Sequence, residues 1–351
     1  MSFGIYAISF PNPPNRDNVM NSLTGDDAHY GFGGSLTADF PSQIMMDITE
    51  VCNLACTHCP HPDFAKSEHY GARMLDPDLN DKMVEEVKNH GQGLTKYIRY
   101  TGNGEPLTHP NGYDMIEHAV KNSGVYVTLT TNGKILNEKR TQRLLDAGVH
   151  LIDISIDAFK PETYANIRVK GNLETTRSNV QRLLKWVEES KCGTKVVVSF
   201  VEQPSNTGEI EDFKKFWNDQ GADFVLIRRL HTHSGAVDNA AQQLHASAEE
   251  KRRPCLYPWE RVSVSAAGAL AFCPSDWVHG SYVADYSQTT IKETWQGEFY
   301  QKLRAAHLNN NFCDHGFCGQ CPDWAATRWP HEGRSYADMI EDFKAEGAST
   351  E

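Results

Sequence analysis

The sequence predicts an α/β fold in which six β/α units form a partial, TIM-like (β/α)₆ barrel, followed by a small cysteine-rich α+β domain. Short apolar runs rich in β-branched residues alternate with helical patterns from residue 43 to about residue 230. Right-handed crossovers between parallel strands curl such a sheet into a barrel. After about residue 232 the alternation stops, and five of the nine cysteines follow.

Six runs are expected to be the strands of the barrel. They span residues 43–49, 96–101, 125–130, 151–156, 195–201 and 223–227, and each ends in Gly, Asn, Asp or another polar residue. Chemistry in such barrels gathers at the C-terminal ends of the strands. An open Rossmann-type sheet is the alternative, but no G-x-G-x-x-G follows the first strand.

Helical patterns separate these strands, at residues 77–90, 113–122, 137–147, 173–190 and 209–219. Two of them carry start signals, Asp76 before Pro77 and Asn137 before Glu138. Several end near a glycine, as at Gly148, which suits the left-handed conformation that closes a helix.

The chain divides by composition into five segments. Residues 1–42, rich in Gly, Pro and Asn, are expected to be an N-terminal extension, and residues 43–232 the barrel. A polar linker with a helix is expected over 233–254, and a C-terminal tail over 326–351. Between them, residues 255–325 carry short strands near 262–264 and 270–272 and a helix near 291–307.

Composition and charge exclude several classes of protein. The net charge is −12 with dispersed basic residues, which argues against a nucleic-acid partner. No apolar run of about 18 residues is present to cross a membrane, and the N-terminus lacks the pattern of a secretory signal. We therefore expect a cytoplasmic protein, in which nine cysteines indicate metal or redox chemistry more often than disulfides.

The stretch TEVCNLACTHCP places Cys52, Cys56 and Cys59 in a C-x₃-C-x₂-C pattern directly after the first strand. A disulfide knot, a zinc site and an iron–sulfur cluster are the alternatives. Zinc takes four protein ligands in structural sites, or three plus water in catalytic ones. Three thiolates suit a four-iron cluster with one iron left open to an exogenous ligand, because each Cys supplies one ligand to one iron.

This cysteine pattern, at the end of the first strand of such a barrel, resembles the radical S-adenosylmethionine (SAM) superfamily. Further segments match that family in order along the barrel, over about residues 43–230. They are TGNGEP (101–106) after the second strand, TTNG (130–133) after the third, and SIDA (155–158) with the later Arg168 after the fourth.

The resemblance implies a pocket for SAM. Glu105 and the backbone around Gly102 and Gly104 would bind the methionine amino group. Ser155 and Arg168 would hold the carboxylate, for which a guanidinium fork is suited.

His58, Asn132 and Asp157 are also assigned to this pocket, His58 near the adenine. Taken singly, these positions have structural interpretations too: a solvated loop acid for Glu105, helix caps for Ser155 and Asp157, a packed imidazole for His58 and a surface position for Arg168.

A second cysteine set follows the barrel. Cys255, Cys273, Cys318 and Cys321 make a complete four-thiolate set, which on spacing alone suits a zinc ion or an iron–sulfur cluster equally. The spacing Cys-x₁₂-Gly-x₄-Cys followed by C-x₂-C resembles the auxiliary-cluster extensions called SPASM and twitch domains. The full SPASM form carries seven cysteines and this region has five, so one auxiliary [4Fe–4S] cluster is implied.

Two cysteines remain outside these sets. Cys313 is an alternative ligand, a packed thiol or a hydrogen-atom donor, and the packed thiol is the favoured interpretation. Cys192, at a helix–strand junction, is expected to be structural.

The resemblance implies an enzyme in which a low-potential electron cleaves SAM, and a 5′-deoxyadenosyl radical takes hydrogen from a substrate at the barrel mouth. A fully ligated auxiliary cluster would accept the second electron. A radical SAM oxidoreductase acting on a sugar, aminocyclitol or nucleotide-sugar is therefore the leading hypothesis. After the sixth strand, Arg228, Arg229 and His231 are candidates for catalysis or phosphate binding, as is His233.

Three alternatives stay open. A radical epimerase would need a free cysteine as hydrogen donor, Cys313 or Cys192, and a peptide-modifying maturase would use the same clusters. A zinc-stapled binding protein is the non-enzyme alternative. The expected partners are a small-molecule substrate, with a peptide as the other option, and a flavodoxin or ferredoxin-type electron donor; no nucleic acid or membrane is expected.

Overall fold

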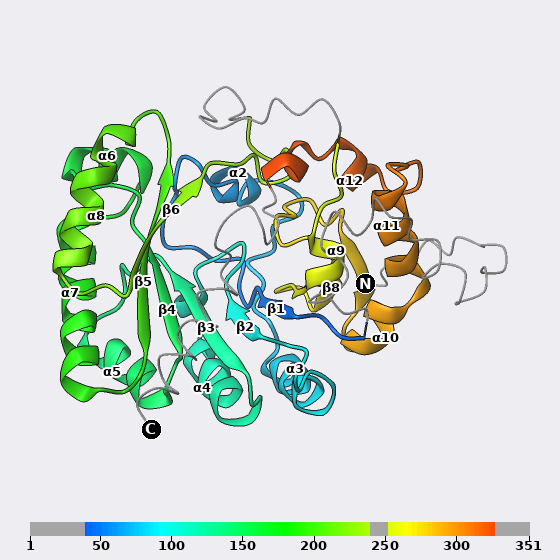
Figure 1. The fold of residues 1–351 in the computed structure, drawn as a ribbon, viewed down its shortest axis with the longest axis horizontal. Helices are drawn as coiled ribbons and strands as arrows, with labels where there is room; N and C mark the ends of the chain where they lie inside the picture. The colour runs from blue at the N-terminus through cyan, green and yellow to red at the C-terminus, as the bar shows by residue number, and fades with distance from the viewer. Residues whose placement is uncertain (1–38, 239–251, 327–351) are drawn as a thin grey trace.

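A computed structural model describes residues 39–238 and 252–326 of the chain. These residues form one nine-stranded sheet in the order β6-β5-β4-β3-β2-β1-β7-β8-β9. In Figure 1 the barrel elements, blue to green, fill the left and centre of the view, and the C-terminal elements, yellow to red, lie on the right. Most of the expected extension (1–42), of the expected linker with its helix (233–254) and of the expected tail (326–351) lies outside the described residues.

The predicted partial barrel is confirmed. Its strands are β1 (Gln43–Met46), β2 (Tyr97–Tyr100), β3 (Tyr126–Thr131), β4 (Leu151–Ser155), β5 (Lys195–Glu202) and β6 (Phe224–Arg229). Every neighbouring pair among them is parallel, so their C-terminal ends share one edge. β1 pairs on its other side with a later strand rather than with β6, and the barrel is therefore open.

The five predicted helices are present as α3 (Pro77–His90), α4 (Gly112–Asn122), α5 (Glu138–Ala147), α7 (Leu173–Ser190) and α8 (Ile210–Asp219). The expected start signals act as caps: Asp76 and Asn137 accept backbone hydrogen bonds from Asp78 and Arg140, each at 3.0 Å. Two short helices, α2 (His61–Phe64) and α6 (Pro161–Ile167), were not predicted, because 4 and 7 residues carry too little periodicity.

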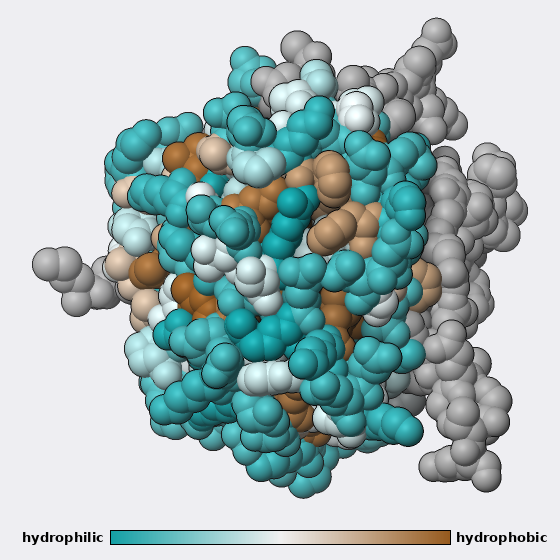
Figure 2. All heavy atoms as spheres, turned by 90° about the vertical axis from the view of Figure 1, so that its left-hand side faces the viewer, coloured by the Kyte–Doolittle hydropathy of each residue, from teal (hydrophilic) through white to brown (hydrophobic). Residues whose placement is uncertain are grey.

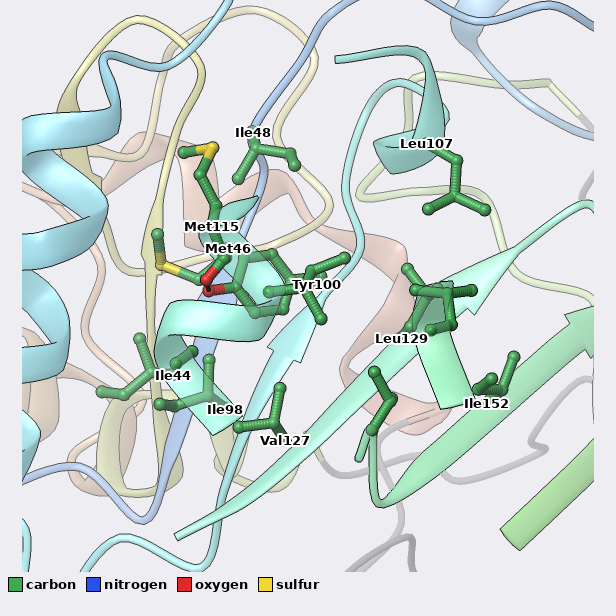
Figure 3. Close-up of a cluster of buried hydrophobic side chains, with 14 of the residues drawn as sticks. Ile44, Met46, Ile48, Ile98, Tyr100, Leu107, Met115, Val127, Leu129 and Ile152 are labelled. Carbon is green, nitrogen blue, oxygen red and sulfur yellow. Dashed lines mark hydrogen bonds between the residues drawn. The ribbon is translucent and has the colours of Figure 1, made fainter. Parts of the chain in front are cut away.

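The main core lies between the outer face of the sheet and the helices that cover it. Figure 3 shows this layer around Met115 of α4, where alternate residues of each strand point the same way. Tyr100 belongs to this layer, and its buried hydroxyl donates to the Asn80 side chain at 2.6 Å. Leu129 is fully buried here, so truncating it to alanine should cost about 2–5 kcal/mol.

The C-terminal region extends the barrel sheet instead of standing apart from it. β7 (Arg261–Val264) pairs in parallel with β1, and β8 (Ala269–Ala271) and β9 (Tyr282–Asp285) follow as an antiparallel ribbon. The helix expected near 291–307 is two helices, α10 (Ile291–Gln296) and α11 (Glu298–Leu308), separated at Gly297. The short helices α9 (Tyr257–Glu260) and α12 (Gly316–Gln320) complete the region.

The outer face over α5–α8 is largely hydrophilic, with small, separate apolar spots (Figure 2). Among the described residues, Met74, Val169 and Val278 are the exposed large hydrophobic side chains. None of the described helices combines the length and the apolar character that crossing a membrane requires.

Candidate functional site

The first cysteine cluster lies on the loop that follows β1, with Cys56 buried and Cys52 and Cys59 partly buried. Two backbone hydrogen bonds hold the loop against the C-terminal end of α6: Ala55 donates to Val169 at 3.0 Å, and Thr57 donates to Ile167 at 2.9 Å. The three thiols are therefore held together at the C-terminal edge of the sheet.

The electrostatics of this loop suit an iron–sulfur cluster. Burial, with the neighbouring thiols adding to it, raises the pKa of Cys52 to about 11 and that of Cys59 to about 12. Thiolates in this place therefore need a cationic partner, which cluster iron supplies.

Glu105 follows β2 and is the N-cap of a 3₁₀ turn, η2 (Pro106–Thr108). It is 3% exposed, so the interpretation as a solvated loop acid is wrong. Its carboxylate accepts hydrogen bonds from the Thr131 hydroxyl at 2.7 Å and from the Asn132 backbone at 2.8 Å. Glu105 therefore ties the loop after β2 to the loop after β3, and burial raises its pKa.

Gly102 and Gly104 allow the same loop to approach the chain after β1. A Cβ at Gly102 would lie 2.1 Å from Asp47 Oδ1, and one at Gly104 would lie 2.2 Å from the Thr49 carbonyl oxygen. The Asp47 carboxylate accepts a hydrogen bond from the Asn103 backbone at 3.0 Å. These glycines thus have a packing reason for their presence, beside the contact to SAM that the resemblance implies.

Arg168 and Asp157 form a buried ion pair at the end of β4. Arg168 Nη1 also donates to the Cys56 sulfur at 3.7 Å, and His58 Nε2 lies 3.5 Å from Asp157 Oδ2. Asp157 has a positive φ of 64°, and its other oxygen accepts from the Val201 backbone at 2.7 Å. The SAM-pocket candidates Asp157, Arg168 and His58 thus form one group, which contacts the Cys56 thiol through Arg168.

Two buried polar atoms of Arg168 and His58 are available to hydrogen-bond a bound ligand. Among the described residues, Arg168 Nε and His58 Nδ1 are buried without a hydrogen-bond partner. Burial lowers the pKa of His58 to about 4, so its ring is neutral near pH 7. Buried polar groups are nearly always paired in folded proteins, and a bound polar molecule would supply the missing partners.

The structural interpretations of Ser155, Asp157 and Arg168 are wrong. Helix α6 has Lys160 as its N-cap, so Ser155 and Asp157 do not cap it. Arg168 is 7% exposed and is not a surface residue. Ser155 is the partly buried last residue of β4.

Inside the barrel, Asp153 is fully buried between two arginines. Arg228 Nη2 lies 2.6 Å from Asp153 Oδ2 and Arg99 Nη2 lies 3.2 Å from it, while Ser199 donates to the other oxygen at 2.7 Å. Arg228 therefore lies on the inner face of β6. Arg229, the next residue, is exposed and by strand alternation lies on the opposite face. The expectation that both arginines face one site is therefore wrong for Arg229.

His231 and His233 lie on the segment after β6, with ring centroids 4.1 Å apart. Asp323 holds this segment from the C-terminal region: its carboxylate accepts from the Thr232 and Ser234 backbones, and His231 Nδ1 lies 3.6 Å from it. Although burial acts in the opposite direction, these hydrogen bonds lower the pKa of Asp323 to about 2.

The second cysteine set lines one cavity. Cys255, Cys273, Cys318 and Cys321 all contact it, together with His231 and Ser234 of the segment after β6. Ser234 Oγ lies 3.6 Å from the Cys273 sulfur. A complete four-cysteine set around one cavity fits an auxiliary cluster, and the 231–234 segment reaches it from the end of the barrel.

The two remaining cysteines lie apart from both sets. Cys313 is exposed and does not line the cavity, so the packed-thiol interpretation is wrong. Cys192 is also exposed, which removes the expected structural role.

Sequence reasoning missed several residues that shape the site. Asp153 carries a weak signal, a carboxylate at a central position of an otherwise apolar strand. Asp47, Asp323 and Arg99 carry none, because their roles depend on contacts between segments that are distant in the chain.

Two family models match the chain. The Radical SAM superfamily model matches residues 46–200, and the SPASM model, described as an iron–sulfur cluster-binding domain, matches residues 255–322. The two matches cover the first cysteine loop and the second cysteine set respectively.

Curated relatives match part of the chain. A probable GTP 3′,8-cyclase of Methanococcus maripaludis is 33% identical over 140 residues, 40% of this chain and 44% of the relative. The AdoMet-dependent heme synthase of Methanosarcina barkeri is 30% identical over 171 residues, 48% of this chain and 47% of the relative. The chain thus spans about half the length of the curated relatives it matches.

Solved structures share the fold. BtrN in complex with AdoMet and 2-DOIA superposes with a TM-score of 0.56 at 17% identity, covering 80% of this chain and 92% of that one. Streptococcus suis SuiB bound to the precursor peptide SuiA gives 0.62 at 12% identity, covering 97% and 82%. At these identities the likeness concerns the fold alone.

Proposed function

The chain belongs to the radical SAM superfamily and is an enzyme with a C-terminal SPASM domain, and from this premise we propose that it is an oxidoreductase. Its substrate would be a small polar molecule of the sugar, aminocyclitol or nucleotide-sugar class, oxidised by two electrons.

The cofactors of such a chain are SAM, a [4Fe–4S] cluster in the barrel and an auxiliary iron–sulfur cluster. Bound together, they supply hydrogen-atom abstraction at the barrel mouth and a one-electron acceptor in the C-terminal region. Cys52, Cys56 and Cys59 would hold the first cluster, leaving one iron for SAM. Arg168, with an unpartnered Nε beside Cys56, is suited to bind the SAM carboxylate.

The observation that carries the oxidoreductase proposal is the four-cysteine cavity joined to the barrel by the 231–234 segment. Four cysteine ligands leave no open iron for a substrate, so a cluster there is suited to electron transfer. A net two-electron oxidation needs an electron acceptor besides SAM, and a cluster in this cavity would supply it.

Two residues of this chain would act on the substrate, one by binding it and the other by accepting a proton from it. Arg228, anchored by Asp153 on the inner face of the barrel, is suited to a phosphate or to several hydroxyl groups. His231 would take the proton of the hydroxyl that is oxidised, and Asp323, 3.6 Å from its Nδ1, would stabilise the protonated ring.

The positions of the two remaining cysteines favour oxidation over epimerisation. All nine cysteines lie in the described part of the chain, and Cys192 and Cys313 are exposed and do not line the four-cysteine cavity. An epimerase of this kind would need a thiol facing the substrate.

The proposal is tested by anaerobic incubation of the reconstituted protein with SAM, a reductant and a panel of sugars, aminocyclitols and nucleotide-sugars in D₂O. A product that has lost two hydrogen atoms, formed in step with 5′-deoxyadenosine, supports oxidation. A product of unchanged composition that carries solvent deuterium would instead mean epimerisation. Turnover of peptides alone would overturn the substrate class.

A further inference from the structure

A surface hollow lies beside the first cysteine loop, where β2 and β3 end and α4 and α5 begin. Its lining includes Asn53, Tyr113, Lys139, Arg140 and Arg143, and we call it the basic hollow. None of these residues is assigned to the SAM pocket or to the interior of the barrel.

The basic hollow departs from the charge of the chain as a whole. The chain carries −12, whereas the lining of the hollow contains three cationic side chains and, among the described residues, no carboxylate. Arg143 pairs with Asp114, and Glu138 lies on the same helix, so part of this charge is offset. Lys134 adds a further cation at the Asn53 end of the hollow.

Asn53 links the hollow to the cluster loop. It directly follows Cys52, and its side-chain oxygen accepts from Asn132 Nδ2 at 2.7 Å. Its carbonyl accepts from Lys134 Nζ at 3.3 Å, and the same ammonium donates to the Lys170 carbonyl at 2.8 Å. One wall of the hollow is therefore the residue next to a proposed cluster ligand.

Two other parts of the cysteine loop pack against the protein. Cys56 faces the buried pair Arg168 and Asp157. On the α2 side, Phe64 packs edge-on against Trp277 with ring centroids 5.4 Å apart. Asn53 is the point at which the basic hollow meets the loop.

We propose that the basic hollow is the docking surface for the protein that reduces the first cluster, a small acidic electron-transfer protein of the flavodoxin or ferredoxin type. The inference rests on the cluster assignment made in the proposed function, and it does not depend on the substrate. One electron passes: the donor is oxidised by one electron and the cluster is reduced by one, with no bond made or broken.

Charge complementarity supports this occupant. An acidic donor is repelled at long range by a chain of net charge −12, so productive encounter needs a local region of opposite sign near the cluster. Exposed charges act over about 8–10 Å at physiological salt, which limits the useful region to the immediate surroundings of the loop. The basic hollow meets both conditions.

Lys139→Glu/Arg140→Glu is the test variant. Both residues lie in the first turn of α5, where acidic side chains are favourable to the helix dipole, and the Asn137 cap binds the Arg140 backbone rather than its side chain. Lys214→Glu/Lys215→Glu on α8 is the matched control. It makes the same change in net charge at a pair of neighbouring lysines outside the hollow.

The experiment measures the rate of cluster reduction by purified, fully reduced flavodoxin in an anaerobic stopped-flow instrument, at low and high salt. We expect the hollow variant to react about tenfold more slowly than wild type at low salt and to lose the salt dependence. The α8 variant should stay close to wild type. Sodium dithionite, a small reductant, should reduce all three proteins alike.

Equal rates for wild type and the hollow variant would overturn the proposal. So would an equal loss in both variants, since net charge rather than a docking surface would then set the rate. Binding of oxidised flavodoxin, measured by calorimetry, should weaken in the hollow variant alone. If dithionite produces no spectral change in wild type, the cluster assignment itself has failed, which separates that failure from failure of the docking surface.

Discussion

Arg168 and Asp157 form a buried ion pair that also touches the first cysteine loop, because Arg168 Nη1 donates to the Cys56 sulfur at 3.7 Å. One guanidinium thus joins the end of β4 to a proposed cluster ligand and keeps Nε without a protein partner. This arrangement depends on the planar fork of arginine as much as on its charge.

Arg168→Lys keeps the charge and removes the fork. We expect it to weaken SAM binding about ten- to hundredfold, the loss of one or two charge-assisted hydrogen bonds. Calorimetric titration of the reconstituted protein with SAM checks this, with iron content as the control. Unchanged affinity at unchanged iron content would remove Arg168 from the SAM pocket.

Comparing Arg228→Gln with Arg229→Gln tests the assignment of these two arginines to opposite faces of β6. Arg228 pairs with the fully buried Asp153, so its loss leaves that carboxylate with Arg99 and Ser199 as its described partners and removes a cation from the barrel interior. We expect lower thermal stability and a turnover reduced by about tenfold or more, whereas Arg229→Gln should behave as wild type. Equal effects of the two substitutions would contradict the assignment of faces.

Asp47 should make stability depend on pH. Burial raises its pKa from 3.8 to about 8, so between these values the folded state holds a proton that the unfolded state releases. Stability from this group is therefore fully present below about pH 4 and is lost as the pH rises through about 8. We expect Asp47→Asn to melt higher than wild type at about pH 9 and to show a flatter pH profile. Parallel profiles of the two proteins would contradict the raised pKa.

The nine cysteines should differ in reactivity. Cys192 and Cys313 are exposed, and although desolvation acts in the opposite direction, hydrogen bonds with Ser190 and Thr194 lower the pKa of Cys192. Brief anaerobic treatment of the reconstituted protein with iodoacetamide should label these two, with Cys192 the faster. Peptide mass spectrometry reads the outcome. Rapid labelling of Cys255 or Cys321 would show that they do not hold a cluster.

Local patterns accounted for much of the fold. The strand and helix ranges of the barrel, and the caps at Asp76 and Asn137, depend on residues close together in the chain. Such features can be predicted from periodicity and cap chemistry.

Long-range pairings could not be predicted in the same way. The parallel pairing of β7 with β1 joins segments more than 200 residues apart, and no local pattern marks it. The cysteine sets were found because clustered cysteines are unusual in a loop, and Glu105 was found because the segment TGNGEP resembles one of the radical SAM family. Asp323 and Asp47 were missed, since a single carboxylate in a loop resembles many solvated ones until its partners are known.

The central claim is that the chain holds two iron–sulfur clusters, one at each cysteine set. The most direct test is the iron and acid-labile sulfide per chain after anaerobic reconstitution, in wild type and in a Cys52/Cys56/Cys59→Ala variant. We expect about eight iron in wild type and about four in the variant, because two four-iron sites would lose one. About four iron in wild type, falling to none in the variant, would leave the second cysteine set without a cluster and would contradict the proposed oxidation.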